Sequence, residues 1–229
     1  MDWQDLEQRM AALRMPEETP SPALLQDLER KLTAGLVPVT PLRPAGEIAA
    51  VWGVIFALVV WAGVAKLRPM ALPILGTGTA ILLLGVLVMG AIALMLSMAR
   101  QMAPGSRYRI PPAVLPAAVL GGVAVLFAAV YPAQAAAGWP PGRKCLEVGL
   151  AVGLVTGGLF WLVLRRGAFL HPRLAGATAG LAAGLAGTTV LTIHCPIVEA
   201  PHVILWHLGA AALCALLGMA ILPKRFRDS

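Results

Sequence analysis

The sequence is poor in charged side chains: Asp, Glu, Lys and Arg make up only 13% of its 229 residues, whereas 59% are hydrophobic. A chain of this composition is too apolar to fold as a water-soluble domain. It also lacks a contiguous basic stripe with interleaved aromatic residues, so its net charge of +7 does not indicate direct nucleic-acid binding. The N-terminus is polar and of mixed charge, unlike a signal peptide. We therefore expect a membrane protein whose first residues stay on the side where they are made.

Motifs for catalysis and transport are missing as well. No nucleophile has a base beside it, and the chain has no phosphate-binding loop, no CxxC and no HxxxH. The apolar segments contain threonines but few of the ionisable residues from which ion or proton pathways are built. We expect a protein that is not an enzyme and requires no cofactor. Two alternatives stay open: a small multi-pass transporter or channel subunit, and a membrane thiol oxidoreductase.

Long apolar runs fill the chain from about residue 47 to its C-terminus. A helix needs about 20 apolar residues to cross the hydrocarbon core, and a segment in lipid must satisfy its own backbone hydrogen bonds. The sequence thus predicts an all-α membrane protein with six transmembrane helices in residues 47–222, between an N-terminal arm (1–46) and a basic tail (223–229). The predicted helices are 47–66, 71–98, 113–131, 145–164, 174–193 and 203–222. The second run has to tilt, kink or protrude, because it is longer than the bilayer requires.

The basic residues are distributed unevenly between the two sides that six crossings define. One side, which includes both termini, has fourteen of the eighteen Lys and Arg residues, and the other has only Lys66, Arg68, Arg143 and Lys144. Short cytoplasmic loops are enriched in Lys and Arg. The sequence therefore predicts a membrane protein with both termini in the cytoplasm.

The arm contains two short amphipathic patterns, separated by a proline-bounded break at residues 16–20. The second pattern opens with Ser21 as its N-cap and Pro22 at its first helical position, and Gly35 is its predicted C-cap. Residues 37–44 form a proline-rich lead into the first membrane helix. The apolar positions that share a face in the two predicted helices are Leu6, Met10, Leu13, Leu24, Leu25, Leu28 and Leu32.

Helices this short are marginal in water, so their apolar faces must dock on something. The membrane surface, a second copy of the chain and a soluble protein partner are all possible. The arm has seven acidic and five basic residues, whereas a surface of anionic lipid selects a face rich in Lys and Arg. This balance favours a protein partner, and a basic one.

Cysteines and histidines gather at the predicted non-cytoplasmic ends of the helices. Cys145 opens the fourth helix, His194 and Cys195 close the fifth, His202 precedes the sixth, and His207 follows five residues later. Cys145 and Cys195 can form a disulfide or a redox-sensing pair. With His194 and His202 they can also bind zinc, copper or a heavy metal. A third interpretation is that they are ordinary helix-end residues, since their spacing specifies neither chemistry.

Several segments together resemble the NrsF-like bacterial inner-membrane proteins. The likeness spans the arm and the six helices and is weakest in the third and fourth. It is found at residues 36–44 (LVPVTPLRP), 145–146 (CL), 164–168 (LRRGA), 172–176 (PRLAG), 179–184 (AGLAAG), 194–196 (HCP) and 206–207 (WH).

The resemblance implies an anti-sigma factor that holds an extracytoplasmic-function (ECF) sigma factor in the cytoplasm and releases it under stress. The leucines and Met10 of the arm would then contact the sigma factor. Cys145, Cys195 and His194 are the positions that match a sensor of oxidant or metal stress on the periplasmic face.

Overall fold

The computed structural model describes residues 21–34, 43–102, 111–133, 142–165, 167 and 169–227, with side chains up to residue 223. The chain forms two compact units, Met1–Pro41 and Leu42–Ser229, and each is described by itself. The predicted first arm helix, with Leu6, Met10 and Leu13, lies outside the described residues. So do Gly35 and residues 37–42 of the proline-rich lead.

The described part of the first unit is one amphipathic helix, α2 (Pro22–Thr33). Its first turn is capped as the sequence predicts, because the side-chain oxygen of Ser21 accepts a hydrogen bond from the Leu24 amide at 3.2 Å. Pro22 occupies the first helical position, where its missing amide proton costs nothing. Arg30 and Lys31 lie in the last turn, where cations interact favourably with the helix dipole.

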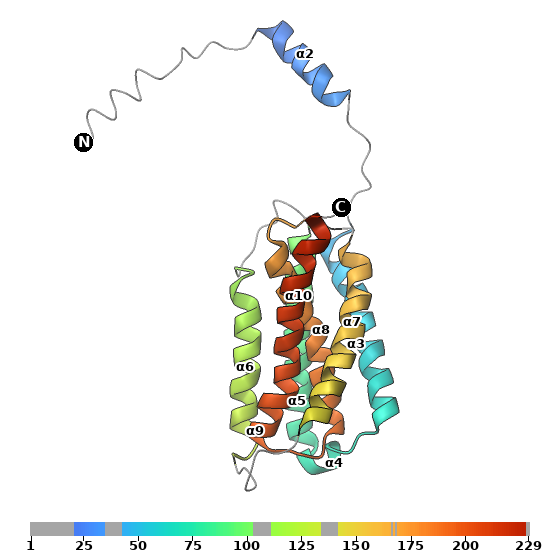
Figure 1. The fold of residues 1–229 in the computed structure, drawn as a ribbon, viewed down its shortest axis with the longest axis vertical. Helices are drawn as coiled ribbons and strands as arrows, with labels where there is room; N and C mark the ends of the chain where they lie inside the picture. Colours follow the sequence, from blue (N-terminus) through green and yellow to red (C-terminus); the bar gives the residue numbers. More distant parts are fainter. Residues whose placement is uncertain are drawn as a thin grey trace, which may run out of the picture. The chain divides into compact units, whose positions relative to one another are not determined.

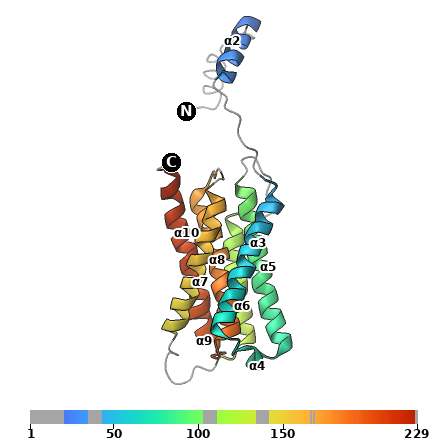
Figure 2. The same cartoon turned by 90° about the vertical axis from the view of Figure 1, so that its right-hand side faces the viewer.

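The second unit is a bundle of long, nearly parallel and antiparallel helices (Figures 1 and 2). The described residues form no strand. A short π-helix, η1, joins α9 to α10. The elements are α3 (Ala45–Leu67), α4 (Leu72–Leu75), α5 (Thr77–Gln101), α6 (Val114–Val130), α7 (Arg143–Leu164), α8 (Pro172–His194), α9 (Ala200–His202), η1 (Val203–Leu208) and α10 (Gly209–Arg227).

Five segments of the described chain are long and apolar enough to cross a membrane: α3, α5, α7, α8 and Ala200–Pro223. The third predicted crossing is α6, an apolar helix of 17 residues that falls below this length. The all-helical prediction is therefore confirmed, and five of the six predicted crossings meet the requirement for length and composition.

The long second run is not one helix. Gly76 has a φ of 73°, a left-handed conformation that side chains disfavour, and it separates the short α4 from α5. Arg68, after the end of α3, also has a positive φ, of 67°. These two turns return the chain into the bundle and leave α5 with 25 residues, which corrects the predicted continuous segment 71–98.

Helix α8 lies at the centre of the bundle. In α8, 83% of an apolar stretch of 18 residues is buried inside the bundle, whereas the corresponding share is 22–33% in the other four candidate spans. Its small residues explain this position, because a Cβ atom on Gly180 would meet the carbonyl of Cys214 in α10, and one on Gly187 would meet that of Gly149 in α7. Glycines of α8 thus lie where the helix backbones approach most closely.

Direct contacts between connections organise the end of the bundle that contains α4 and α9. The Ala71 amide donates to the Ile193 carbonyl at 3.0 Å, and the Ala200 amide donates to the Pro132 carbonyl at 3.1 Å. The link before α4 is thereby tied to the end of α8, and the start of α9 to the residues that follow α6. This end is lowest in Figures 1 and 2. Helix α7 begins here and α8 ends here, so the two predicted sensor cysteines lie at this end.

Candidate thiol and metal site

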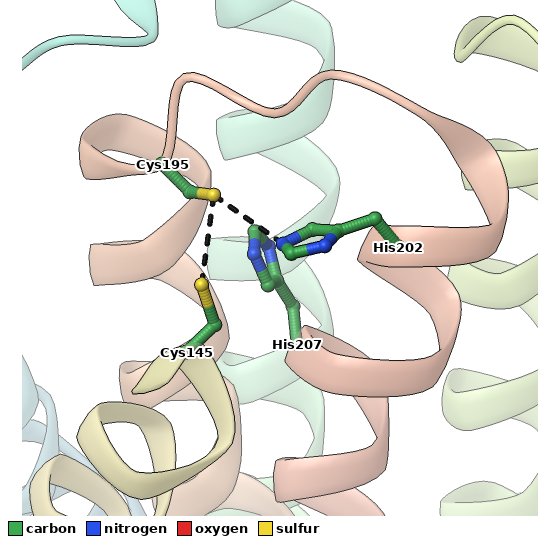
Figure 3. Close-up of side chains that lie close together, drawn as sticks. All are labelled: Cys145, Cys195, His202 and His207. Carbon is green, nitrogen blue, oxygen red and sulfur yellow. Dashed lines mark hydrogen bonds between the residues drawn. The ribbon is translucent and has the colours of Figure 1, made fainter. Parts of the chain in front are cut away.

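Two cysteines fifty residues apart in sequence meet at this end of the bundle (Figure 3). Cys145 lies in the first turn of α7, and Cys195 is the residue that follows α8. Their Sγ atoms are 3.6 Å apart, and both thiols are free. Cys195 is buried and Cys145 is partly buried. The structure thus brings together the pair that the sequence proposes.

Two imidazoles complete the group. His202 ends α9, and its Nε2 lies 3.4 Å from Sγ of Cys195. His207 lies in η1, and its ring packs edge to face against that of His202 with 5.2 Å between centroids. One ligand atom from each of the four residues lies within 4.8 Å of all the others. The candidate site therefore consists of Cys145, Cys195, His202 and His207.

The π-helical turn explains how two histidines five residues apart reach the same site. In a regular α-helix, residues five apart are turned by about 140° and face different sides. A π-helix closes its hydrogen bonds over five residues and brings such positions back into line. Because η1 spans Val203–Leu208, it places His207 on the side of His202.

A side chain from α8 supports this turn. The hydroxyl of Thr188 lies 3.1 Å from the His207 carbonyl oxygen and 3.3 Å from that of Gly184 in its own helix. It is thus placed to donate to a backbone carbonyl of η1. On the other side, Gly142 before α7 lies against the indole of Trp206, where a Cβ atom would not fit. The start of α7 and the π-helical turn are consequently in close contact.

Burial dominates the electrostatics of the site. His202 and His207 are 0% and 1% exposed. Nδ1 of His202 and both ring nitrogens of His207 have no hydrogen-bond partner among the described residues. An unsatisfied buried polar group typically costs about 1–3 kcal/mol. The packing of the pocket alone does not explain why these nitrogens are buried without partners.

The two thiols are not equivalent. The hydrogen bond between the two thiols lowers the pKa of Cys195, and its hydrogen bond with His202 acts in the same direction. Desolvation opposes both effects without reversing them. Cys195 is therefore the thiol in which negative charge is favoured. A thiolate is the form that reacts with oxidants and binds metals.

The predicted ligand set needs one correction. His194 is not part of the group, and its Nδ1 lies 3.0 Å from the Arg68 carbonyl oxygen. His207 takes the place that the sequence interpretation gave to His194. Its spacing from His202 does not fit a regular helix, so only the π-helical turn could reveal it. Glu147 does not belong to the site either, since it pairs with Arg143 and Lys144.

Most of the buried threonines in the described bundle form hydrogen bonds within their own helices. The hydroxyls of Thr156, Thr178, Thr189 and Thr192 each donate to the carbonyl four residues earlier, at 2.7–2.8 Å. Threonines in apolar helices commonly satisfy their hydroxyls in this way. The bundle thus provides no specific observation in favour of the transporter alternative.

The second set of candidate residues lies on α2. Leu24, Leu25, Leu28 and Leu32 are between 51% and 66% exposed, and the helix has no buried residue. Four leucines at this spacing share one face of the helix. An apolar face left this open is typical of a helix that docks in a groove of a partner.

Comparison with known families gives one match. The family described as "NrsF: Negative regulator of sigma F" matches residues 32–227 of the chain. The match begins at the end of α2 and includes the whole described bundle with the four site residues. No curated protein and no solved structure matches the chain.

Proposed function

The chain belongs to the NrsF family of negative regulators of sigma F, and from this premise we propose that it is a membrane-embedded anti-sigma factor. It holds an ECF-type sigma factor through its N-terminal cytoplasmic helices. It releases this partner when an oxidant or metal stress acts on the periplasmic face. The observation that carries the proposal is the family match over residues 32–227.

The bundle provides the membrane anchor in this proposal. Five helices have the length and composition of membrane spans, and we propose α6 as the sixth crossing. Its 17 residues extend about 26 Å, against a hydrocarbon core of about 30 Å, a mismatch that local thinning of the bilayer accommodates. Both termini then face the cytoplasm of a bacterial cell, in agreement with the asymmetric distribution of Lys and Arg.

The exposed leucine face of α2 is the sigma-binding surface in this proposal. A sigma factor contacts DNA phosphates when it acts, so the surface that makes these contacts is basic. The arm has seven acidic and five basic residues, which suits such a partner better than anionic lipid. Leu6, Met10 and Leu13 extend the contact in the same way, through the predicted first arm helix.

The sensing site and the start of α3 lie at opposite ends of the bundle. Helix α3, which follows the arm in the sequence, begins at the other end from the start of α7 and the end of α8 (Figure 2), where Cys145 and Cys195 lie. A signal at the thiols has to pass along the bundle, and the closely packed α8 connects the two ends. Because its backbone lies against α7 and α10, a shift at Cys195 is transmitted to both neighbours.

The test is capture of the sigma factor by the full-length protein. Tagged protein is purified in mild detergent from its native host, and co-purifying proteins are identified by mass spectrometry. We expect a sigma factor with the wild-type chain, and loss of most of it with the double variant Leu24→Asp/Leu28→Asp, because charge in an apolar interface is strongly unfavourable.

The matched control places the same two charges on the other face of α2. Ala23→Asp/Gln26→Asp has an identical change in charge and leaves the leucines intact, so it should retain the sigma factor. If the two double variants captured equal amounts, the leucine face would not be the contact. If the wild-type chain captured no sigma factor, the proposed function would be wrong.

A further inference from the structure

We propose that Cys145, Cys195, His202 and His207 bind one tetrahedrally coordinated metal ion of the zinc class. The ligands are the two Sγ atoms, Nε2 of His202 and one ring nitrogen of His207. The site itself follows from the geometry of the bundle. Its use as the sensing element rests on the proposed function.

The distances between the ligand atoms match the edges of a tetrahedron around zinc. Zinc binds sulfur at about 2.3 Å and imidazole nitrogen at about 2.0–2.1 Å, so the ligand atoms of a tetrahedral site are separated by about 3.3–3.8 Å. The Sγ–Sγ distance is 3.6 Å, and the distance from Cys195 Sγ to His202 Nε2 is 3.4 Å. All four ligand atoms lie within 4.8 Å of one another, so His207 completes the set with a small movement of its ring.

The unsatisfied histidines point to the same ligand. His207 is 1% exposed, and both of its ring nitrogens lack a hydrogen-bond partner among the described residues. Figure 3 shows its ring beside that of His202 and next to the two sulfurs. A neutral imidazole binds a metal through a nitrogen lone pair. A bound ion would therefore supply the partner that the protein does not.

Charge balance favours a divalent ion in this buried place. When the ion binds, each thiol releases its proton to solvent, and the two thiolates neutralise the two positive charges of the metal. The occupied site has no net charge, whereas two buried thiolates alone would be costly. Two sulfur and two nitrogen ligands in a tetrahedron are the typical environment of zinc in proteins.

The ligands come from separate helix ends, which explains why the sequence has no contiguous metal motif. Cys145 lies in the first turn of α7, Cys195 follows α8, His202 ends α9, and His207 lies in η1. An ion bound by all four would fasten three helix ends to one point. Its arrival, loss or replacement would change the packing of the central helix, which is what a sensor requires.

The test is metal binding by the full-length protein, purified in detergent and reduced, with no sigma factor present. Elemental analysis after incubation with Zn²⁺ and dialysis should give one zinc per chain. Titration with Cd²⁺ should produce the ultraviolet absorption of cadmium–thiolate bonds and saturate at one equivalent. His207→Ala should lower the affinity more than 100-fold, beyond the roughly 10–100-fold typical of a lost outer-shell partner.

Two controls use residues of the same types outside the group. His194→Ala removes an imidazole at the same end of the bundle, and Cys214→Ser removes a buried thiol in α10. Both variants should bind zinc like the wild type. Circular dichroism and gel filtration of every variant identify any that fail to fold, and the wild-type titration decides the question without them.

The proposal is overturned if reduced wild-type protein with two titratable site thiols binds neither Zn²⁺ nor Cd²⁺. It is also overturned if folded His207→Ala and His194→Ala bind zinc equally well. Neither result bears on capture of the sigma factor, which is measured separately. Failure of the metal site and failure of the anti-sigma function are thus distinguished.

Discussion

At the scale of single residues, the site depends on where four side chains end up after folding. Cys145 and Cys195 are fifty positions apart, yet their sulfurs are 3.6 Å from each other. Cys214, the third thiol, is buried in α10 and does not belong to the group. His207 belongs to the group, whereas the sequence suggested His194. Contacts between helix ends therefore decide which side chains form the site.

The two site thiols should be necessary for the response to stress. In a host with a reporter for the sigma factor, we expect Cys145→Ser/Cys195→Ser to abolish the difference between stressed and unstressed cells. The serine hydroxyl neither forms a disulfide nor binds a soft metal as a thiolate does.

Cys214→Ser is the matched control, since it removes a buried thiol outside the site and should leave induction intact. The measurement is reporter activity with and without oxidant or metal, normalised to the amount of protein in the membrane. Normal induction in the double variant would rule out the thiol pair as the sensor.

At the scale of elements, the π-helical turn is the feature that makes the site possible. A regular α-helix from Ala200 onward would turn His207 away from His202. The unusual turn has a supporting contact, because the Thr188 hydroxyl of α8 lies 3.1 Å from the His207 carbonyl oxygen. π-helical turns are rare and occur often at functional sites. Helix α8 thus packs against its neighbours at the centre of the bundle and also stabilises the turn that contains His207.

This contact predicts a difference between two adjacent threonines. Thr188→Val keeps the shape of the side chain but removes the donor to His207, and should destabilise the protein by about 1 kcal/mol. Thr189→Val is the control, because its hydroxyl donates only to the Leu185 carbonyl within α8. That carbonyl belongs to the helical backbone, so a smaller effect is expected.

Thermal unfolding of both variants in detergent, followed by circular dichroism, measures the difference. Equal unfolding temperatures for Thr188→Val and Thr189→Val would show that the contact with η1 contributes nothing to stability.

At the scale of the whole molecule, the two ends of the bundle differ in their side chains. The end that contains α4 and α9 has the thiols, the imidazoles and four basic residues, namely Lys66, Arg68, Arg143 and Lys144. Six crossings place the other fourteen Lys and Arg residues on the opposite side, and Arg100, Arg165 and Arg173, at or beside described helix ends, are among them. Short loops rich in Lys and Arg stay in the cytoplasm, so the proposed topology places the thiol end in the periplasm.

This topology can be tested with one cysteine at each end of the bundle. Met70 lies before α4 and Leu170 before α8, and both are exposed. In a chain whose three native cysteines are replaced by serine, a membrane-impermeant maleimide added to intact spheroplasts should label Met70→Cys. It should label Leu170→Cys only after lysis, because that residue lies on the cytoplasmic side. The reverse pattern would contradict the assigned orientation.

Composition and periodicity alone were enough to predict the class of fold. Apolar runs of about 20 residues in lipid must be helical, because each backbone N–H and C=O group needs a hydrogen-bond partner within the segment. Local rules also predicted the start of α2, because an N-cap serine and a proline act within one helical turn. The break at Gly76 was not placed, because glycine permits a left-handed conformation without requiring it.

The sequence by itself thus determined the helical architecture, the exposed leucine face and the choice of Cys145 and Cys195 as the thiols of interest. Only the tertiary structure decided that His207 joins them in place of His194. The physical reason is range. Hydropathy and capping act between near neighbours, whereas the site is built where α7, α8 and η1 meet. The geometry of the site depends on a π-helical turn that no local pattern in the sequence predicts.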